Sequence, residues 1–361
     1  METANALINT KPGFMTEADL PEINFTHISN LTDTTGIIQH ALYHIPNLKE
    51  GYCIDDNSRA LLLMVWAARD KNNRLAQRLL PVYLSFIHYM QTETGGFRNF
   101  MNYDKTCPEK NGSEDSFGRT LMALGYLVNE GHSPLLIKAA KEIFQNVYRR
   151  IDNLVSVRGI ANTIIGLCQF IKGNYPDDLK KEMVICLANK MTRMYHANTI
   201  GQWQWFEPIL SYDNAMLPLA LLHAYELTGD DMYLSIANES MHFLESKVFH
   251  NNMLRPVGNM GWLPRGGVAA QFDQQGIDAM AMVLYYHQAL NLFGDKKYLS
   301  RMCDSYQWFL GANDLGLSLY DPETGGCADG LQAEGINYNK GAESTLAYWI
   351  SHLAVANALN K

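Results

Sequence analysis

Pairs of neighbouring acidic residues stand where the sequence predicts that helices begin. The stretch GYCIDDNSRALLLMVWAARD, residues 51–70, places Asp55 and Asp56 directly before a long apolar run. Glu114 and Asp115 stand in the same place before a second apolar run. One acidic residue is enough to cap a helix, where its side chain accepts a backbone N–H bond worth about 1 kcal/mol. The second carboxyl of each pair is surplus to capping, and two carboxyls can serve as general acid and general base.

Further acidic residues recur before later apolar runs. Glu207 precedes Asp213, Asp273 precedes Asp278, and Glu343 lies at the start of the last run. Capping is the simplest interpretation of any one of them. If all of them lie at one end of the molecule, their mutual repulsion is costly unless they face solvent, bind a ligand or share protons. The pattern therefore favours a common site.

Cleavage of a glycosidic bond needs one protonated and one ionised carboxyl. Because a helix N-terminus stabilises an anion, Asp56 and Asp115 suit the role of the base. Glu207 lies among aromatic residues in WQWFEP, which favours a protonated carboxyl. We predict Glu207 as the acid and Asp115 or Asp56 as the base, with Asp278 and Glu343 as substitutes.

Four loops rich in Trp, Phe, Tyr, Gly and Asn lead towards these helix starts, at 94–104, 201–214, 259–267 and 320–330. Aromatic faces can stack on sugar rings, and carboxylates and amides can bond sugar hydroxyls. A carbohydrate cleft is the prediction, although any one tryptophan is more often a core residue. The predicted substrate-binding residues are Asp55, Asn57, Arg59, Phe97, Arg98, Glu114, Arg119, Trp203, Trp205, Asp213, Asn214, Trp262, Asp273, Asp278 and Glu343.

Several arginines accompany the acidic residues. Arg59 and Arg119 follow acidic helix starts by three or four residues, a spacing typical of ion pairs within one helix. Alternatively, they contact a carboxylate or phosphate of the substrate. That alternative leaves phosphorolysis or a uronate substrate open beside hydrolysis.

The elements that must position these residues are helices. Six strongly apolar segments alternate with amphipathic ones, as expected for inner and outer helices. The seven residues GDDMYLS at 229–235 match GDKKYLS at 294–300, which indicates a repeat. The apolar segments begin near Asp56, Asp115, Arg158, Asp213, Asp278 and Gly341.

Five amphipathic helices follow the first five apolar ones, and residues 34–45 are predicted to supply a sixth outer helix. The last helix, near Lys361, is as apolar as the central ones, whereas an open solenoid would end in a polar cap. We therefore predict an all-α fold, a closed ring of six helical hairpins over residues 34–361. Residues 1–33 are predicted to form an irregular N-terminal arm.

This pattern resembles the (α/α)₆ toroid of the six-hairpin glycosidase superfamily. The segments GYCIDDNSRAL, EDSFGRTLMAL and NKGAESTLAYWISHL make it similar to toroidal domains associated with glycosyltransferases. The resemblance implies a substrate cleft at the mouth where the inner helices start, an oligosaccharide substrate, and an inverting hydrolase. A non-catalytic glycan-binding toroid that partners a glycosyltransferase is the alternative from another class.

A sugar epimerase built on the same toroid is a further alternative, since such enzymes use histidines as acid and base. His223, His287 and His352 fall nine to ten residues into inner helices, deeper than the mouth. We therefore interpret them as core residues.

Composition excludes several other classes. The formal net charge of −8 disfavours a nucleic-acid partner, and no apolar run is long enough to span a membrane. No secretory signal is evident, and six scattered cysteines favour a reduced, cytoplasmic protein. The chain contains no nucleotide-binding motif and no clustered metal ligands, so we predict neither cofactor nor metal.

Overall fold

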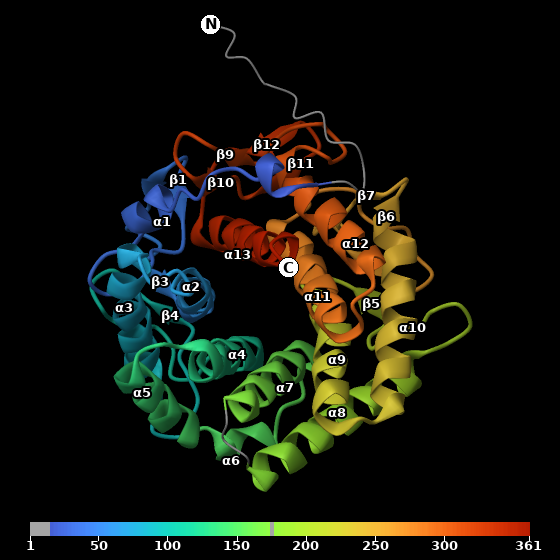
Figure 1. Cartoon of the computed structure of the whole chain (residues 1–361), viewed down its shortest axis with the longest axis horizontal. Helices are drawn as coiled ribbons and strands as arrows, with labels where there is room; N and C mark the ends of the chain where they lie inside the picture. Colours follow the sequence, from blue (N-terminus) through green and yellow to red (C-terminus); the bar gives the residue numbers. More distant parts are fainter. Residues whose placement is uncertain (1–14, 174–176) are drawn as a thin grey trace, which may run out of the picture.

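The computed structural model describes residues 15–173 and 177–361. Within these ranges, six helices line the inside of a ring (Figure 1). Each begins within three residues of its predicted start, because the apolar runs are long enough to specify a helix buried on several sides. The inner helices are α2 (Ile54–Ala67), α4 (Glu114–Glu130), α7 (Val157–Lys172), α9 (Met216–Thr228), α11 (Gly276–Phe293) and α13 (Ala342–Leu359).

The outer layer consists of helices that pack on the inner ones, and a short helix, α6 (Tyr148–Ile151), that continues the layer (Figure 1). Asp177, Asp230 and Asp295 cap three of them by accepting a backbone N–H bond, which is the ordinary use of aspartate at a helix start. The outer helices are α1 (Thr26–Leu31), α3 (Arg74–Met90), α5 (Pro134–Gln145), the short α6 (Tyr148–Ile151), α8 (Asp178–Asn198), α10 (Asp231–Val248) and α12 (Lys296–Gln307).

The sixth outer helix is not where the sequence predicted it. Residues 34–45 do not form a helix; they lead into the hairpin of β1 (Ala41–Leu42) and β2 (Ile45–Pro46). The outer position is filled by the six-residue α1, which packs on α13. Part of the predicted irregular arm is therefore helical. β1 and β2 pair across a tight turn, and this turn interrupts the helical conformation that the apolar residues of 34–45 would otherwise favour.

The ring closes. Each inner helix contacts the next one, and α13 contacts α2 (Figure 1). The all-α (α/α)₆ toroid is thus confirmed. The boundary between an arm and a toroid domain at residue 33 stays a prediction.

Two pairs of glycines set the closest approach in the ring, between α4 and α7. A Cβ atom at Gly118 would collide with the carbonyl oxygen of Gly159, and one at Gly125 with that of Gly166. The two helices therefore touch through their backbones along this line. Any larger side chain there would push α4 and α7 apart.

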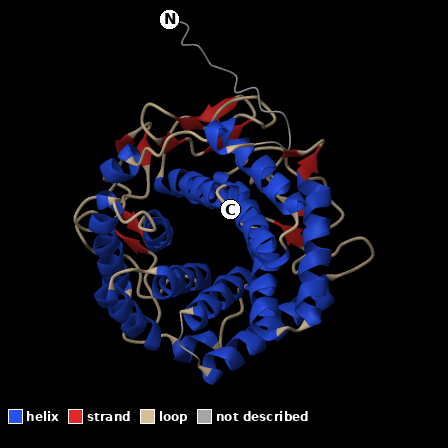
Figure 2. Cartoon of the chain, viewed as in Figure 1, coloured by secondary structure: helices blue, strands red, loops and turns tan. Residues whose placement is uncertain are grey.

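Short antiparallel strand pairs join the helices, mostly around the edge of the ring (Figure 2). None of the described strands is longer than three residues, so they shape loops rather than a sheet. The 3₁₀ helices are Glu17–Asp19 and Trp308–Leu310. The remaining strands are β3 (Tyr52–Cys53) with β4 (Phe100–Met101), β5 (Ile209–Leu210) with β8 (Leu263–Pro264), β6 (Phe249–His250) with β7 (Met253–Leu254), β9 (Tyr320–Asp321) with β10 (Gly326–Cys327), and β11 (Gly330–Gln332) with β12 (Gly335–Asn337).

No helix in the described part of the chain is both long and apolar enough to cross a membrane. All six cysteines are free. The cytoplasmic location stays a prediction.

Candidate functional site

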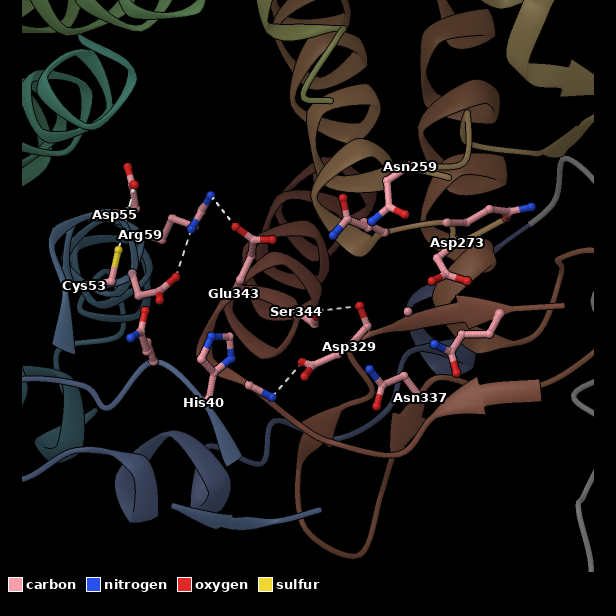
Figure 3. Close-up of a pocket in the computed structure, with 17 residues that line it drawn as sticks. His40, Cys53, Asp55, Arg59, Asn259, Asp273, Asp329, Asn337, Glu343 and Ser344 are labelled. Carbon is pink, nitrogen blue, oxygen red and sulfur yellow. Dashed lines mark hydrogen bonds and ion pairs between the residues drawn. The ribbon is translucent and has the colours of Figure 1, made fainter. Parts of the chain in front are cut away.

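A cavity of about 280 Å³ opens where α2 and α13 begin. Its walls come from α2, α13, the segment before α11 and the β11–β12 hairpin (Figure 3). Five acidic residues line it, and Arg59 is the one Lys or Arg among its lining residues. The acidic residues are Asp55, Asp56, Asp273, Asp329 and Glu343.

The acidic residues of the inner helices do not act as N-caps. Cys53 occupies the cap position of α2, and the Ser113 hydroxyl caps α4 by accepting the Ser116 N–H bond. Asp55, Asp56 and Asp115 lie in the first helical turn instead. The capping interpretation is therefore wrong for these residues, and their side chains are available for other contacts.

Arg59 serves two carboxylates at once. Its guanidinium bonds Asp56 Oδ1 at 2.9 Å and Glu343 Oε2 at 2.8 Å (Figure 3). The first contact is the ion pair within one helix that the spacing predicted, and the second joins α2 to α13. The Arg59 and Asp56 side chains are 2% and 7% exposed, whereas Glu343 is 40% exposed. A single positive charge thus faces two carboxylates, one of them deeply buried.

Arg119 links three parts of the ring. It forms ion pairs with Asp55 of α2 and, at 3.1 Å, with Asp213 in the segment before α9. It does not bond Asp115, the acidic residue four positions before it, so the expected helical pair is absent there. Asp55 also accepts a hydrogen bond from the Ser116 hydroxyl at 2.9 Å.

Asp55 and Asp56 are neighbours with opposite electrostatic environments. Burial raises the pKa of the Asp56 carboxyl to about 7. The positive charge of Arg59, which Asp56 shares with Glu343, lowers this pKa but does not compensate for the lost hydration. Burial also acts on Asp55, but the charges of Arg119 and Arg59 outweigh it and lower the pKa of that carboxyl. Near neutral pH, Asp56 can hold a proton while Asp55 stays ionised. Opposite shifts of this kind are typical of an acid and a base at a catalytic site.

Asp329 lies at the start of the β11–β12 hairpin and faces the same space (Figure 3). One of its carboxylate oxygens accepts the Gly341 N–H bond at 2.7 Å. Burial raises the pKa of Asp329 to about 6, and the charge of Glu343 contributes in the same direction. Its carboxylate can therefore take up a proton near neutral pH.

The opposite part of the mouth, formed by α4, α7 and the segment before α9, has its carboxylates engaged. Asp115 accepts hydrogen bonds from the hydroxyls of Ser156 and Tyr212. Glu207 forms an ion pair with Arg158 at 2.7 Å. Neither residue lines the cavity. The catalytic roles of Glu207 and Asp115 stay predictions, and their contacts do not favour those roles.

Glu114 belongs to the same part of the mouth. Its carboxylate accepts the backbone N–H bonds of Val155 and Ser156, both at 2.6 Å, and so holds the segment that enters α7. These contacts fit a structural role.

The predicted aromatic platforms are mostly core residues. Trp203 and Trp205 are 7% and 0% exposed, and both pack near Phe243. Phe97 is also buried. Trp262 is half-buried, with its ring centre 6.2 Å from that of Tyr212. None of the four lines the cavity, because the long apolar rings find more contacts in the core than at the mouth.

Glu114, Arg119 and Asp213 also lie outside the cavity lining, as do four further predicted residues. Asn57 is buried, and its side-chain amide forms hydrogen bonds with the backbone of Ile37 and Cys53. The side-chain amide of Asn214 forms hydrogen bonds with the Ser211 backbone. Arg98 is half-buried. Asp278 is buried behind the mouth, and that burial raises its pKa to about 8.

Sequence reasoning missed Asp329, His40, Asn259 and Asn337, all of which line the cavity. Asp329 and Asn259 belong to loops noted for their Gly and polar residues, so a signal was present. Asp329 lies 13 positions before the first residue of α13, and no helix start marks it. His40 and Asn337 gave no sequence signal.

Within the described ranges, no group of three His, Cys, Asp or Glu side chains is arranged to hold a metal ion. The five cavity carboxyls therefore surround the space without converging on one point.

Solved structures with the same (α/α)₆ toroid fold cover nearly the whole chain at low sequence identity. A sugar epimerase from a ruminal bacterium superposes with a TM-score of 0.71 at 12% identity, covering 92% of this chain and 95% of that one. The cellobiose 2-epimerase of Spirochaeta thermophila gives 0.68 at 12% identity, with coverage of 93% and 94%. The GH76 α-mannanase BT2949 of Bacteroides thetaiotaomicron gives 0.66 at 13% identity, again with 93% and 94%.

Another structure with a similar fold is that of an inactive enzyme variant with two substitutions. It is an α-1,6-mannanase from Salegentibacter in complex with α-1,6-mannotetrose, inactive because two successive aspartates are replaced by alanine. It matches at 12% identity and a TM-score of 0.63, covering 92% of this chain and 96% of that one. No family model and no curated protein sequence matches the chain.

Proposed function

We propose that this protein hydrolyses a glycosidic bond in the cavity at the start of α2 and α13. The observation that carries the proposal is the surplus of carboxyls over cations there. Five carboxyls line one cavity with Arg59, so near neutral pH at least one of them holds a proton while others stay ionised. A protonated and an ionised carboxyl in one cavity are what the reaction needs.

Asp56 is the proposed proton donor. Its carboxyl transfers a proton to the glycosidic oxygen as the bond from that oxygen to the anomeric carbon breaks. Asp329 is the proposed base, because its carboxylate faces the cavity from a different chain segment and has no arginine partner among the described residues. It takes a proton from a water molecule whose oxygen attacks the anomeric carbon. The products are two sugars, and the anomeric configuration inverts.

The adjacent pair Asp55–Asp56 supports the assignment. The mannanase that lost activity when two successive aspartates were replaced has a similar fold. In this chain Asp55 would remain ionised through Arg119 and stabilise positive charge that develops on the sugar.

A screen of disaccharides and nitrophenyl glycosides for hydrolysis tests the proposal. We expect activity in the native protein and its loss in Asp56→Asn and Asp329→Asn. Glu207→Gln and Asp115→Asn test the residues that the sequence favoured, and Glu182→Gln on the exposed face of α8 is the control. Full activity of both Asp56→Asn and Asp329→Asn contradicts the assignment, and loss only in Glu207→Gln or Asp115→Asn restores the roles that the sequence predicted.

Sugar epimerisation is the second candidate, since the first two similar structures named above are epimerases. The histidines of the inner helices do not favour it: His223, His287 and His352 lie outside the cavity lining, and His352 bonds the buried Tyr306 hydroxyl at 2.8 Å. An epimerase exchanges a carbon-bound hydrogen with solvent. Deuterium uptake from heavy water into an unbroken sugar would therefore support epimerisation over hydrolysis.

The glycan-binding scaffold and its glycosyltransferase partner stay predictions. A scaffold would need no surplus of unneutralised carboxyls in its cleft. Retained glycan binding with no turnover of any glycan in the screen is the result that would favour it.

A further inference from the structure

The charges of the cavity also bear on the kind of sugar that it accepts. Arg59 is already engaged by Asp56 and Glu343, at 2.9 and 2.8 Å. His40, the other basic residue of the lining, is charged only when protonated. An anionic group of a substrate would therefore meet no unengaged arginine or lysine among the lining residues.

Two further arginines of the mouth, Arg119 and Arg158, are engaged as well. Arg119 bonds Asp55 and Asp213. Arg158 bonds Glu207, the Ser211 hydroxyl and the Tyr212 carbonyl oxygen, with distances of 2.6–2.7 Å. Both side chains are at most 6% exposed. They hold the ring together and are not placed to bind a phosphate or carboxylate of a ligand.

Two carboxyls of the cavity differ from these arginines, because no ion pair with a described side chain neutralises them. Asp273 forms no ion pair with any described side chain, and the hydrogen bonds of Asp329 come from neutral groups. Both face the space that Glu343 also faces (Figure 3). Besides Asp56, four acidic side chains line the cavity together with Arg59.

A metal ion does not account for this surplus. No three of the carboxyls in the described chain approach closely enough to hold a cation between them. The acidic groups are instead spread around a volume of about 280 Å³, a size that suits a small organic ligand. A ligand with a positive charge would match the surplus of carboxyls, and its hydroxyl groups could donate hydrogen bonds to the same carboxyls.

We propose that this cavity binds a sugar that carries a protonated amino group, in preference to the neutral sugar, and rejects the corresponding uronic acid. The ammonium lies between Asp273 and Asp329. This inference names the substrate class of the proposed hydrolase and rests on the same cavity.

Binding of matched monosaccharides to the native protein tests the inference without requiring turnover. The probes are the amino, neutral and uronic-acid forms of glucose, mannose and galactose, measured by calorimetry at about 20 mM and about 300 mM salt. We expect at least one amino sugar to bind about tenfold more tightly than its neutral form at low salt. The advantage should shrink at high salt, and the uronic acids should bind least.

Variants locate the effect. Asp273→Asn should remove most of the preference for the amino sugar and leave binding of the neutral sugar, whereas Glu182→Gln on α8 should change neither. Asp329→Asn provides a second measurement if Asp273→Asn does not fold. Equal binding of amino and neutral sugars, binding of a uronic acid as tight as that of its neutral form, or no binding of any amino sugar overturns the inference.

The outcome is separable from that of the proposed function. A preference for amino sugars without hydrolysis of any glycan would contradict the hydrolase and keep the inference. Hydrolysis of neutral glycans with no preference for an amino group would do the reverse.

Discussion

The two parts of the ring mouth contain the same residue types but use them differently. At α2 and α13, carboxyls outnumber the cations and face an open cavity. At α4, α7 and the segment before α9, each predicted acidic residue has bonding partners, as in the pairs Arg158–Glu207 and Tyr212–Asp115. The comparison teaches that acidic residues at a helix start become candidates for catalysis only where partners are too few to neutralise them.

The difference arises from one arginine per helix. Arg59, Arg119 and Arg158 lie near the starts of three successive inner helices, and each bonds a carboxylate from another part of the chain. Arg158 has a single carboxylate partner, whereas Arg59 and Arg119 each have two. Burial raises the pKa of Asp56, because Arg59, which Asp56 shares with Glu343, lowers that pKa too little to compensate.

The largest expected effect compares catalytic variants across the mouth. Asp56→Asn should lower kcat by about 10²–10⁴-fold, because the amide cannot donate an acidic proton. Asp115→Asn, at the corresponding place in α4, should lower it by less than about tenfold. Steady-state kinetics on a hydrolysed glycoside measures both. Equal losses would mean that the two parts of the mouth act together.

The next effect concerns the stability of the ring. Arg119→Met removes the partner of the buried Asp213 and of the partly buried Asp55, and should lower the free energy of unfolding by about 3–5 kcal/mol. Arg69→Met breaks a more exposed pair with Glu130 and should cost less than about 1 kcal/mol. Urea unfolding monitored by circular dichroism compares them. A small loss for Arg119→Met would show that the two carboxylates find other partners.

The pH dependence of activity should reflect the Asp56 and Asp329 side of the mouth. The proposed base, Asp329, becomes protonated as the pH falls below about 6, and the proposed acid, Asp56, loses its proton as the pH rises above about 7. A plot of kcat/KM against pH should be bell-shaped with a maximum between these values. A profile that stays flat up to pH 9 would exclude Asp56 as the donor.

Stability provides a smaller, independent measure of the same carboxyl. Because the pKa of Asp56 is raised in the folded state, the fold binds a proton that the unfolded chain has released. The contribution of Asp56 to the free energy of unfolding therefore falls as the pH rises from about 4 to about 7. Asp56→Asn should remove this slope. The free energy of unfolding of the variant, relative to that of the native protein, should therefore be higher at pH 8 than at pH 4. Parallel unfolding curves at both pH values would contradict the raised pKa.

The smallest expected effect is that of inorganic phosphate. Arg59, Arg119 and Arg158 are engaged by carboxylates, so phosphate should neither replace water as the acceptor nor alter the rate by more than about twofold. Product analysis by chromatography, with and without phosphate, checks this. A sugar phosphate among the products would mean that one of these ion pairs opens during turnover.

The sequence by itself determined the helices and their order. Apolar runs at helical spacing specify inner helices, and their predicted starts lie within three residues of those of α2, α4, α7, α9, α11 and α13. It also identified Asp55, Asp56, Arg59, Asp273 and Glu343, which do line the cavity. These features are local, since they depend on neighbours a few positions away along the chain.

Only the tertiary structure decided how the charges are paired. Asp56 and Asp115 occupy similar positions in their helices, yet one shares Arg59 with Glu343 and the other accepts two hydroxyl hydrogen bonds. Asp329 reaches the cavity from a hairpin that no periodic pattern marks. Partners that lie 41 to 284 residues apart are brought together when the ring closes, and a carboxyl's protonation depends on those partners and on burial rather than on its place in the sequence.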